Sequence, residues 1–344
     1  MKRISIPIWA RRALRLLGRG SLVLLAMLLL FEVAYRYQWI DTYRKVPESL
    51  NPAEVLNAQG RTLLVMGDSF SATRDAWVDR LRPRLPGMRI VNAAISGTGI
   101  VQADIMAPAL LERFQPDILV YQIYTGNDLA DLRYPIAWTK VGFFRNLYWL
   151  AAQNFRSLAW LNNAFGQWRK AETPEDLLPA FKAPFDPSRY TAREKLLLQA
   201  DPGLIEHQAY LSGGREGDID AYLSRLESLL ARCEAQGTQV YLLVLPHCAQ
   251  VSPRYTQQMT ALGAAFSGAW QPKADYPFLS RIAGYVQGRA QVLSPLAAFQ
   301  ALEAAGDTLY YNNDSHLNPK GQAFLGDWVA NALQTPTQIP NEAM

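Results

Sequence analysis

Residues 61–69 read RTLLVMGDS, an apolar run of strand length that ends in Gly-Asp-Ser. Continuous apolar runs this short are typical of strands that are buried on both faces. The chain contains three more such runs and one weaker one: RIVNAAI (89–95), DILVYQIY (117–124), QVYLLVL (239–245) and QVLSP (291–295). Together they predict a parallel sheet.

The stretches around these runs have lengths and compositions that suit helices. The predicted helices cover residues 75–85, 100–114, 218–236 and 319–333. Asn318 and Pro319 favour the start of the last one, as N-cap and first helical residue. Strands that alternate with helices in this way predict a three-layer α/β domain.

Residues 132–216 interrupt the alternation. This stretch contains no convincing parallel strand but many aromatic residues, among them Trp138, Phe144 and Trp160. We therefore expect an insertion within a domain that covers residues 61–334. Its rings could pack against the domain, form a lid or substrate wall, or rest on a lipid bilayer.

The N-terminus has the pattern of a membrane anchor. Residues 21–31 read SLVLLAMLLLF, and the apolar character extends from about Leu16 to Tyr37, long enough for the roughly 20 residues that a spanning helix needs. Six basic residues precede the run, which predicts a cytoplasmic N-terminus and a domain outside the membrane. A cleaved signal peptide and a buried core helix are the alternatives, and no favourable cleavage site follows the run.

These patterns divide the chain into four parts. We expect a cytoplasmic tail and anchor over 1–40, a linker over 41–60 with two prolines, the domain over 61–334, and a tail over 335–344. The predicted location is the inner membrane, crossed once, with the domain on the periplasmic side.

Charge and cysteine content exclude some classes of function. The first 36 residues carry a net charge of +6, so the rest of the chain carries −2 and has no basic surface suited to nucleic acid. Cys233 and Cys248 flank the run 239–245, which would separate them by about 20 Å, so we expect two free thiols. The scattered His and Cys residues predict no metal site, and we expect no cofactor.

Polar and small residues follow the predicted strands where ligands bind in doubly wound sheets. Gly-Asp-Ser (67–69) ends the first strand, a turn with Gly97 follows the second, and Gly-Asn-Asp (126–128) follows the third. Asp314 and His316 stand before the last helix. These segments could meet at one edge of the sheet.

The residue types at that edge are those of acyl transfer. A serine hydroxyl is a weak nucleophile until a base takes its proton, and His316 is the candidate base for Ser69. Asp314 could orient the imidazole ring. The N–H groups of Ser69 and Gly97 and the amide of Asn127 could stabilise an oxyanion, each donor being worth about 3–4 kcal/mol.

The blocks GDS (67–69), Gly97, GND (126–128) and D-x-H (314–316) resemble the SGNH hydrolases, also called GDSL-like. The resemblance follows the family's block order across residues 61–334, apart from the insertion. It implies a flavodoxin-like sheet in the order 2-1-3-4-5 and hydrolysis or transfer of ester-linked acyl groups. Many members carry the acid three residues before the histidine, where this chain has Asn313, so Asp314 departs from the common spacing.

Each of these residues also has an ordinary structural explanation. Gly97 could be a turn glycine, Asn127 a cap, and His316 a surface residue. Asp68, Asp128 and His247 are candidate substrate contacts, although His247 could simply belong to the loop after its strand.

The sequence leaves three functions open. The first is a membrane-anchored serine esterase with an acyl-Ser69 intermediate, acting on an acylated carbohydrate or a lipid ester of the envelope. The second is an O-acyltransferase that passes an acetyl group to a polysaccharide or cell-wall sugar. The third is a non-catalytic scaffold of an envelope assembly. Neither a P-loop nor a GxGxxG motif follows the first strand, which disfavours nucleotide binding.

Overall fold

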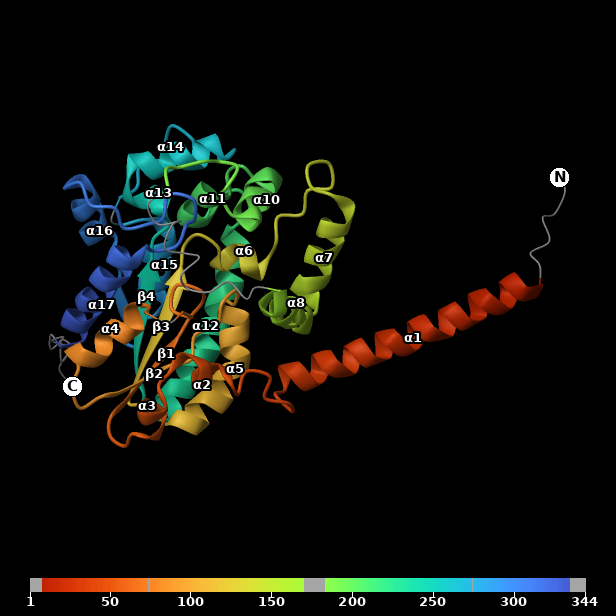
Figure 1. The fold of residues 1–344 in the computed structure, drawn as a ribbon, viewed down its shortest axis with the longest axis horizontal. Coiled ribbons are helices and arrows are strands. Elements are labelled where there is room, and N and C mark those ends of the chain that lie inside the picture. Colours follow the sequence, from red (N-terminus) through yellow and green to blue (C-terminus); the bar gives the residue numbers. More distant parts are fainter. Residues whose placement is uncertain (1–7, 74, 170–182, 274, 335–344) are drawn as a thin grey trace.

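The five predicted strands form one parallel sheet (Figure 1). The computed structural model describes residues 8–73, 75–169, 183–273 and 275–334. The strands are β1 (Thr62–Met66), β2 (Arg89–Asn92), β3 (Ile118–Tyr124), β4 (Gln239–Leu245) and β5 (Gln291–Leu293). Their order is β2-β1-β3-β4-β5, which confirms the expected sheet.

Helices cover both faces of this sheet, as a three-layer α/β domain requires. One pair packs together as α4 (Trp77–Arg84) and α17 (Pro319–Gln334), and another as α5 (Ile100–Phe114) and α12 (Glu216–Ala235). Figure 1 shows the two pairs on opposite sides of the strands. The central strands are mostly apolar because both of their faces are buried, and every residue of β1 and β3 is buried.

The start of α17 is set by the predicted cap. The side-chain oxygen of Asn318 accepts hydrogen bonds from the main-chain N–H groups of Lys320, at 2.9 Å, and Gly321, at 3.0 Å. These bonds satisfy donors that have no partner within the helix. The segment just before α17, which carries His316, is thereby held at a defined place.

The described part of the predicted insertion is helical. It holds α7 (Phe143–Asn154), α8 (Arg156–Arg169), α10 (Ala192–Ala200) and α11 (Leu204–Tyr210), and α6 (Asp128–Leu132) leads into it. Residues 170–182 lie outside the described part of the chain. A small apolar cluster that includes Trp149, Leu197 and Leu204 joins α7 to α10 and α11.

Before the sheet come a long helix and two short ones. They are α1 (Ile8–Arg36), α2 (Val46–Leu50) and α3 (Ala53–Asn57). The segment predicted as a linker touches the domain, because the side chain of Asn51 donates to the carbonyl of Asn92 at 2.7 Å and accepts from its N–H at 2.8 Å. Within α1, Gly18–Arg36 is apolar and long enough to cross a membrane.

Four helices between β4 and α17 were not predicted from the sequence. They are α13 (Cys248–Val251), α14 (Pro253–Ala261), α15 (Pro277–Tyr285) and α16 (Leu296–Ala304). The predicted tail, 335–344, lies outside the described residues. The two cysteines are buried free thiols, as expected.

The contact between α4 and α17 is close enough to require a glycine. A Cβ atom added at Gly326 would lie 2.5 Å from Cβ of Arg80 and 2.7 Å from the carbonyl oxygen of Trp77. By contrast, a Cβ at Gly284 in α15 would meet nothing within 4 Å.

We therefore expect opposite effects from the same substitution at two helical sites. Gly326→Ala forces α4 and α17 apart and should lower the free energy of unfolding by about 1–3 kcal/mol. Gly284→Ala should raise it by up to about 1 kcal/mol, because alanine restricts the unfolded chain. Urea denaturation of both variants measures this, and equal effects would contradict the packing described.

Candidate active site

The strand order brings three of the predicted segments side by side. β1 lies between β2 and β3, and all three run parallel, so the turns that follow them share one edge of the sheet. The main-chain N–H of Ile95 donates to the carbonyl of Gly67 at 2.9 Å, which extends the β1–β2 pairing into these turns.

Ser69 occupies the turn between β1 and α4. The carboxylate of Asp68 accepts a hydrogen bond from the N–H of Phe70 at 2.9 Å, and its carbonyl accepts from the N–H of Ser71 at 3.2 Å. Asp68 and Phe70 are buried, whereas Ser69 between them is partly exposed. The turn therefore presents the serine hydroxyl to the outside.

Polar side chains from β2 and β3 hold this turn. The side-chain oxygen of Gln122 accepts from the N–H of Asp68 at 3.1 Å and from the hydroxyl of Ser71 at 3.0 Å. The amide of Asn92 donates to the carbonyl of Ser71 at 2.7 Å. A Cβ atom at Gly67 would lie 2.6 Å from the same Gln122 oxygen, so this close approach requires glycine.

A further bond ties the serine turn to the helix that follows the histidine. Gln322 in α17 donates to the carbonyl of Phe70 at 3.2 Å and accepts from the N–H of Trp77 at 2.9 Å. The serine and histidine segments are thus fixed to each other as well as to the sheet.

The predicted serine, histidine and acid are in contact. The hydroxyl oxygen of Ser69 lies 2.7 Å from Nε2 of His316, across 247 positions of sequence. Nδ1 of His316 is hydrogen-bonded to the carboxylate of Asp314, which also accepts from the main-chain N–H of His316 at 2.9 Å. With Nδ1 donating to this acid, Nε2 is free to accept the serine proton.

The Phe70 ring lies against the imidazole and is itself packed on Tyr124. The Phe70 ring lies 4.8 Å from the His316 ring and 4.3 Å from the Tyr124 ring, measured between centroids. Phe70 and Tyr124 are buried, so Tyr124 helps to hold the Phe70 ring beside the imidazole.

Opposing effects set the pKa of His316. Burial lowers it, while the adjacent Asp314 carboxylate raises it by charge and by hydrogen bonding, and the net pKa is raised. Asp68 and Glu194 act in the same direction as Asp314.

Gly97 and Asn127 lie in the turns after β2 and β3. Gly97 has a φ of +72°, a backbone conformation that favours glycine. Asn127 precedes α6, and its carbonyl accepts from the N–H of Asp131 at 2.7 Å. Both are partly exposed, as are Ser69 and His316; Asn127 lies between buried residues, and Gly97 lies between exposed Ser96 and buried Thr98.

The three residues predicted as possible substrate contacts are buried, and their contact with a substrate stays a prediction. Asp68, Asp128 and His247 are each at most 3% exposed. Nδ1 of His247 accepts from the N–H of Ala249 at 3.1 Å and so caps α13. Its ring faces Glu194 of α10, with 3.6 Å between Nε2 and the carboxylate.

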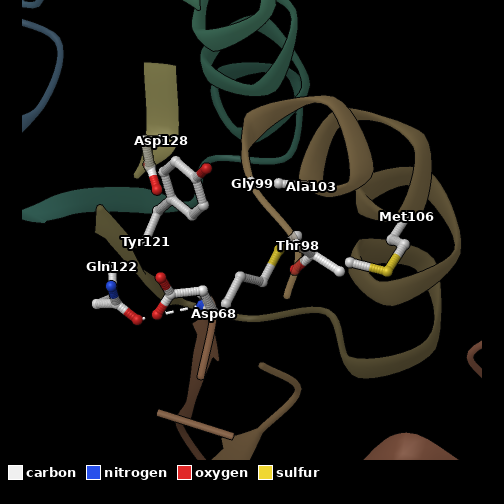
Figure 2. A pocket seen from close by; sticks show the side chains of 10 residues that line it. Asp68, Thr98, Gly99, Ala103, Met106, Tyr121, Gln122 and Asp128 are labelled. Carbon is white, nitrogen blue, oxygen red and sulfur yellow. Dashed lines mark hydrogen bonds between the residues drawn. The ribbon is translucent and has the colours of Figure 1, made fainter. Parts of the chain in front are cut away.

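Asp68 and Asp128 line a small pocket between β1, β3 and the start of α5 (Figure 2). Burial is the main cause that raises the pKa of Asp68 to about 6 and that of Asp128 well above its usual range. Tyr222 donates to Asp128 at 3.2 Å.

Sequence reasoning missed Gln122 and Glu194. Gln122 is a polar residue within an otherwise apolar strand, and that exception could have drawn attention to it. Glu194 lies in the insertion, far from any motif, and no local pattern connects it with the site. Among the described residues, no group of three His, Cys, Asp or Glu side chains could hold a metal ion.

Comparison with known proteins finds esterases. No family model matches the chain. A curated relative that it matches is Esterase TesA from Pseudomonas aeruginosa, 40% identical over 80 residues. These residues make up 21% of this chain and 39% of the relative, so the match spans well under half of the relative's length.

Several solved structures are similar in fold at low sequence identity. TesA is 18% identical, with a TM-score of 0.36, over 80% of this chain and 98% of that one. A catalytic mutant of Axe2, an acetylxylan esterase from Geobacillus stearothermophilus, is 15% identical, with a TM-score of 0.41, over 81% and 96%. A GDSL-like lipase from Bacteroides thetaiotaomicron is 11% identical, with a TM-score of 0.37, over 85% and 96%. Because these TM-scores are low, the reaction is inferred from the geometry of the site and not from these structures.

The fall in rate on the acid side of the pH–rate profile, its acid limb, should reflect protonation of the His316 imidazole. Protonated imidazole cannot accept the serine proton, so kcat/KM should fall below a pKa that lies above the usual histidine value. Asp314→Asn removes the negative charge that raises this pKa, so the limb should move to lower pH. The rate at its optimum should fall by about 10²-fold or more, because the ring also loses its orienting partner.

The chain offers a matched control for this experiment. Asp201 lies 3.2 Å from Nδ1 of His207, a similar pair in the insertion. Asp201→Asn should leave the limb unchanged. A limb that stays in place or rises in Asp314→Asn would show that His316 is not the titrating base.

Proposed function

We propose that this protein is a serine esterase that works through an acyl-Ser69 intermediate. The observation that carries the proposal is the 2.7 Å contact between the Ser69 hydroxyl and Nε2 of His316. A distance in this range is what a general base needs to take the proton from a nucleophile. A scaffold protein would have no need for this contact at a solvent-accessible sheet edge.

In the proposed reaction the Ser69 oxygen attacks the ester carbonyl while its proton passes to His316. The negative charge on the carbonyl oxygen is stabilised by the N–H groups of Ser69 and Gly97 and by the Asn127 amide. The tetrahedral intermediate then breaks its bond to the alcohol, which leaves with the proton from His316. Water repeats the sequence on the acyl-enzyme, releasing the acid and free Ser69.

Support for these oxyanion donors comes from where their segments lie. Gly97 and Asn127 follow the strands on either side of β1, which bears Ser69 at its end. Both are partly exposed beside buried residues. Asn127 also precedes a helix, whose N-terminal end favours negative charge.

We further propose that α1 anchors the enzyme in the inner membrane, with the domain on the periplasmic side. The helix has 29 residues, and its large apolar side chains from Leu22 to Leu30 are exposed, apart from Leu28, which is half-buried. In water such a surface would be costly, whereas in a bilayer it is favourable. This location suggests an ester of the envelope as substrate, either an acylated carbohydrate or a lipid.

Hydrolysis of an aryl acetate by the full chain tests the chemistry. We expect an initial burst of released phenol, followed by turnover. Ser69→Ala removes the nucleophile and should abolish the burst and lower kcat by about 10³-fold or more, and His316→Ala should lower kcat similarly.

Two residues serve as controls. Ser188 is an exposed serine and His207 a histidine paired with an acid, and both belong to the insertion. Ser188→Ala and His207→Ala should keep the parental rate. If Ser69→Ala keeps its full activity, Ser69 is not the nucleophile and the proposal fails.

A further inference from the structure

An exposed apolar surface lies on one face of helix α7 and the turn before it. Five large side chains on this helix and the turn before it are 41–83% exposed, and we call them the α7 patch: Trp138, Phe143, Phe144, Leu147 and Leu150. Three of their rings form a continuous surface, with centroids 5.6 Å apart from Trp138 to Phe143 and from Phe143 to Phe144. Contiguous apolar surfaces of this kind mark sites that contact a protein or a membrane.

The opposite face of α7 is already used for packing. Asn146, Trp149 and Ala152 are buried, and the Trp149 ring stacks on that of Tyr134 with centroids 5.6 Å apart. The helix is therefore apolar on its exposed side as well as inside. Packing within the domain does not explain why the exposed side of α7 is apolar.

The same corner of the domain holds the end of α1. The carboxylate of Glu32 accepts from the main-chain N–H groups of Arg156, at 2.9 Å, and Ser157, at 2.8 Å, and so caps α8. Arg36 donates to the carbonyl of Asn154, the last residue of α7, at 2.9 Å. Figure 1 shows α7 and α8 on the side of the domain from which α1 projects.

Burial along α1 marks where a membrane would end. Leu29 and Leu30 are 47% and 66% exposed, whereas Glu32 and Tyr35 are buried against the domain. The boundary between lipid and water therefore falls within the part of α1 that packs against the domain, where the Phe31 ring lies 5.8 Å from that of Trp160 in α8. Since α7 joins α8 at this point, it lies near the same boundary.

The charge of this segment also suits a membrane surface. Residues 138–154 contain Lys140 and Arg145 and no acidic residue. Both basic residues are exposed, and the Arg145 guanidinium lies over the Tyr148 ring. Apolar side chains beside basic ones are typical of helices that lie in the headgroup region of anionic bilayers.

We propose that the α7 patch inserts into the surface of the bilayer that α1 crosses. The inference rests on the anchor proposed above and adds a second contact to it. A single helix leaves the attached domain free to tilt and rotate. A second contact on the same side holds the domain in one orientation, so that the catalytic edge keeps a constant position relative to the membrane.

Fluorescent probes at single positions of the full chain test this proposal. The native thiols, Cys233 and Cys248, are at most 1% exposed, so an introduced cysteine can be labelled selectively with an environment-sensitive dye. Phe144→Cys reports the α7 patch, Leu29→Cys reports the anchor, and Tyr285→Cys on α15 is the control at an exposed aromatic position elsewhere. The labelled proteins are placed in anionic phospholipid vesicles whose acyl chains carry a nitroxide quencher.

The three positions separate the two proposals. We expect blue-shifted emission and strong quenching at positions 29 and 144, with neither at 285. Quenching at 29 but not at 144 would overturn the α7 contact and leave the anchor intact. Absence of quenching at 29 would overturn the anchor and this inference together. A blue shift at 144 without quenching by lipid would show that protein covers the patch, and would also overturn the proposal.

Discussion

Parallel pairing of β2, β1 and β3 is the constraint on which the rest of this structure depends. Parallel strands end at one edge, so the three turns that follow them have to meet there. Ser69, Gly97 and Asn127 each stand in one of those turns. The main-chain pairing of the strands alone brings these three turns together. If one strand were antiparallel, the turn after it would lie at the opposite edge of the sheet.

The sheet alone does not position His316, which comes from a segment beyond the last strand. That segment is held by α17, whose close packing on α4 depends on Gly326 and whose Gln322 bonds to the serine turn. Buried polar side chains are costly unless their bonds are made. Gln122, Asn92 and Gln322 bond to main-chain groups of the serine turn, and these bonds restrict its movement.

A buried acid links the insertion to the N-terminal helix, beside the contacts that Arg36 and Phe31 make. Glu32 interrupts an apolar run, and in the folded protein its carboxylate caps α8 and pairs with Arg36. A charged group at this depth is stable only with such partners. It joins the proposed anchor to the insertion, so that α1 meets the domain at a defined place.

The sequence by itself determined the strands, the large helices, the sheet order implied by the family resemblance, and the pairing of Ser69 with His316. These features have local signals, namely apolar runs, caps and polar residues at strand ends. Only the tertiary structure decided that Glu32 caps a distant helix, that His247 is buried as a cap, and that Gln122 holds the serine turn. Each of these features depends on contacts with residues far away in the sequence. A local sequence pattern does not predict which distant group a polar side chain will contact in the folded protein.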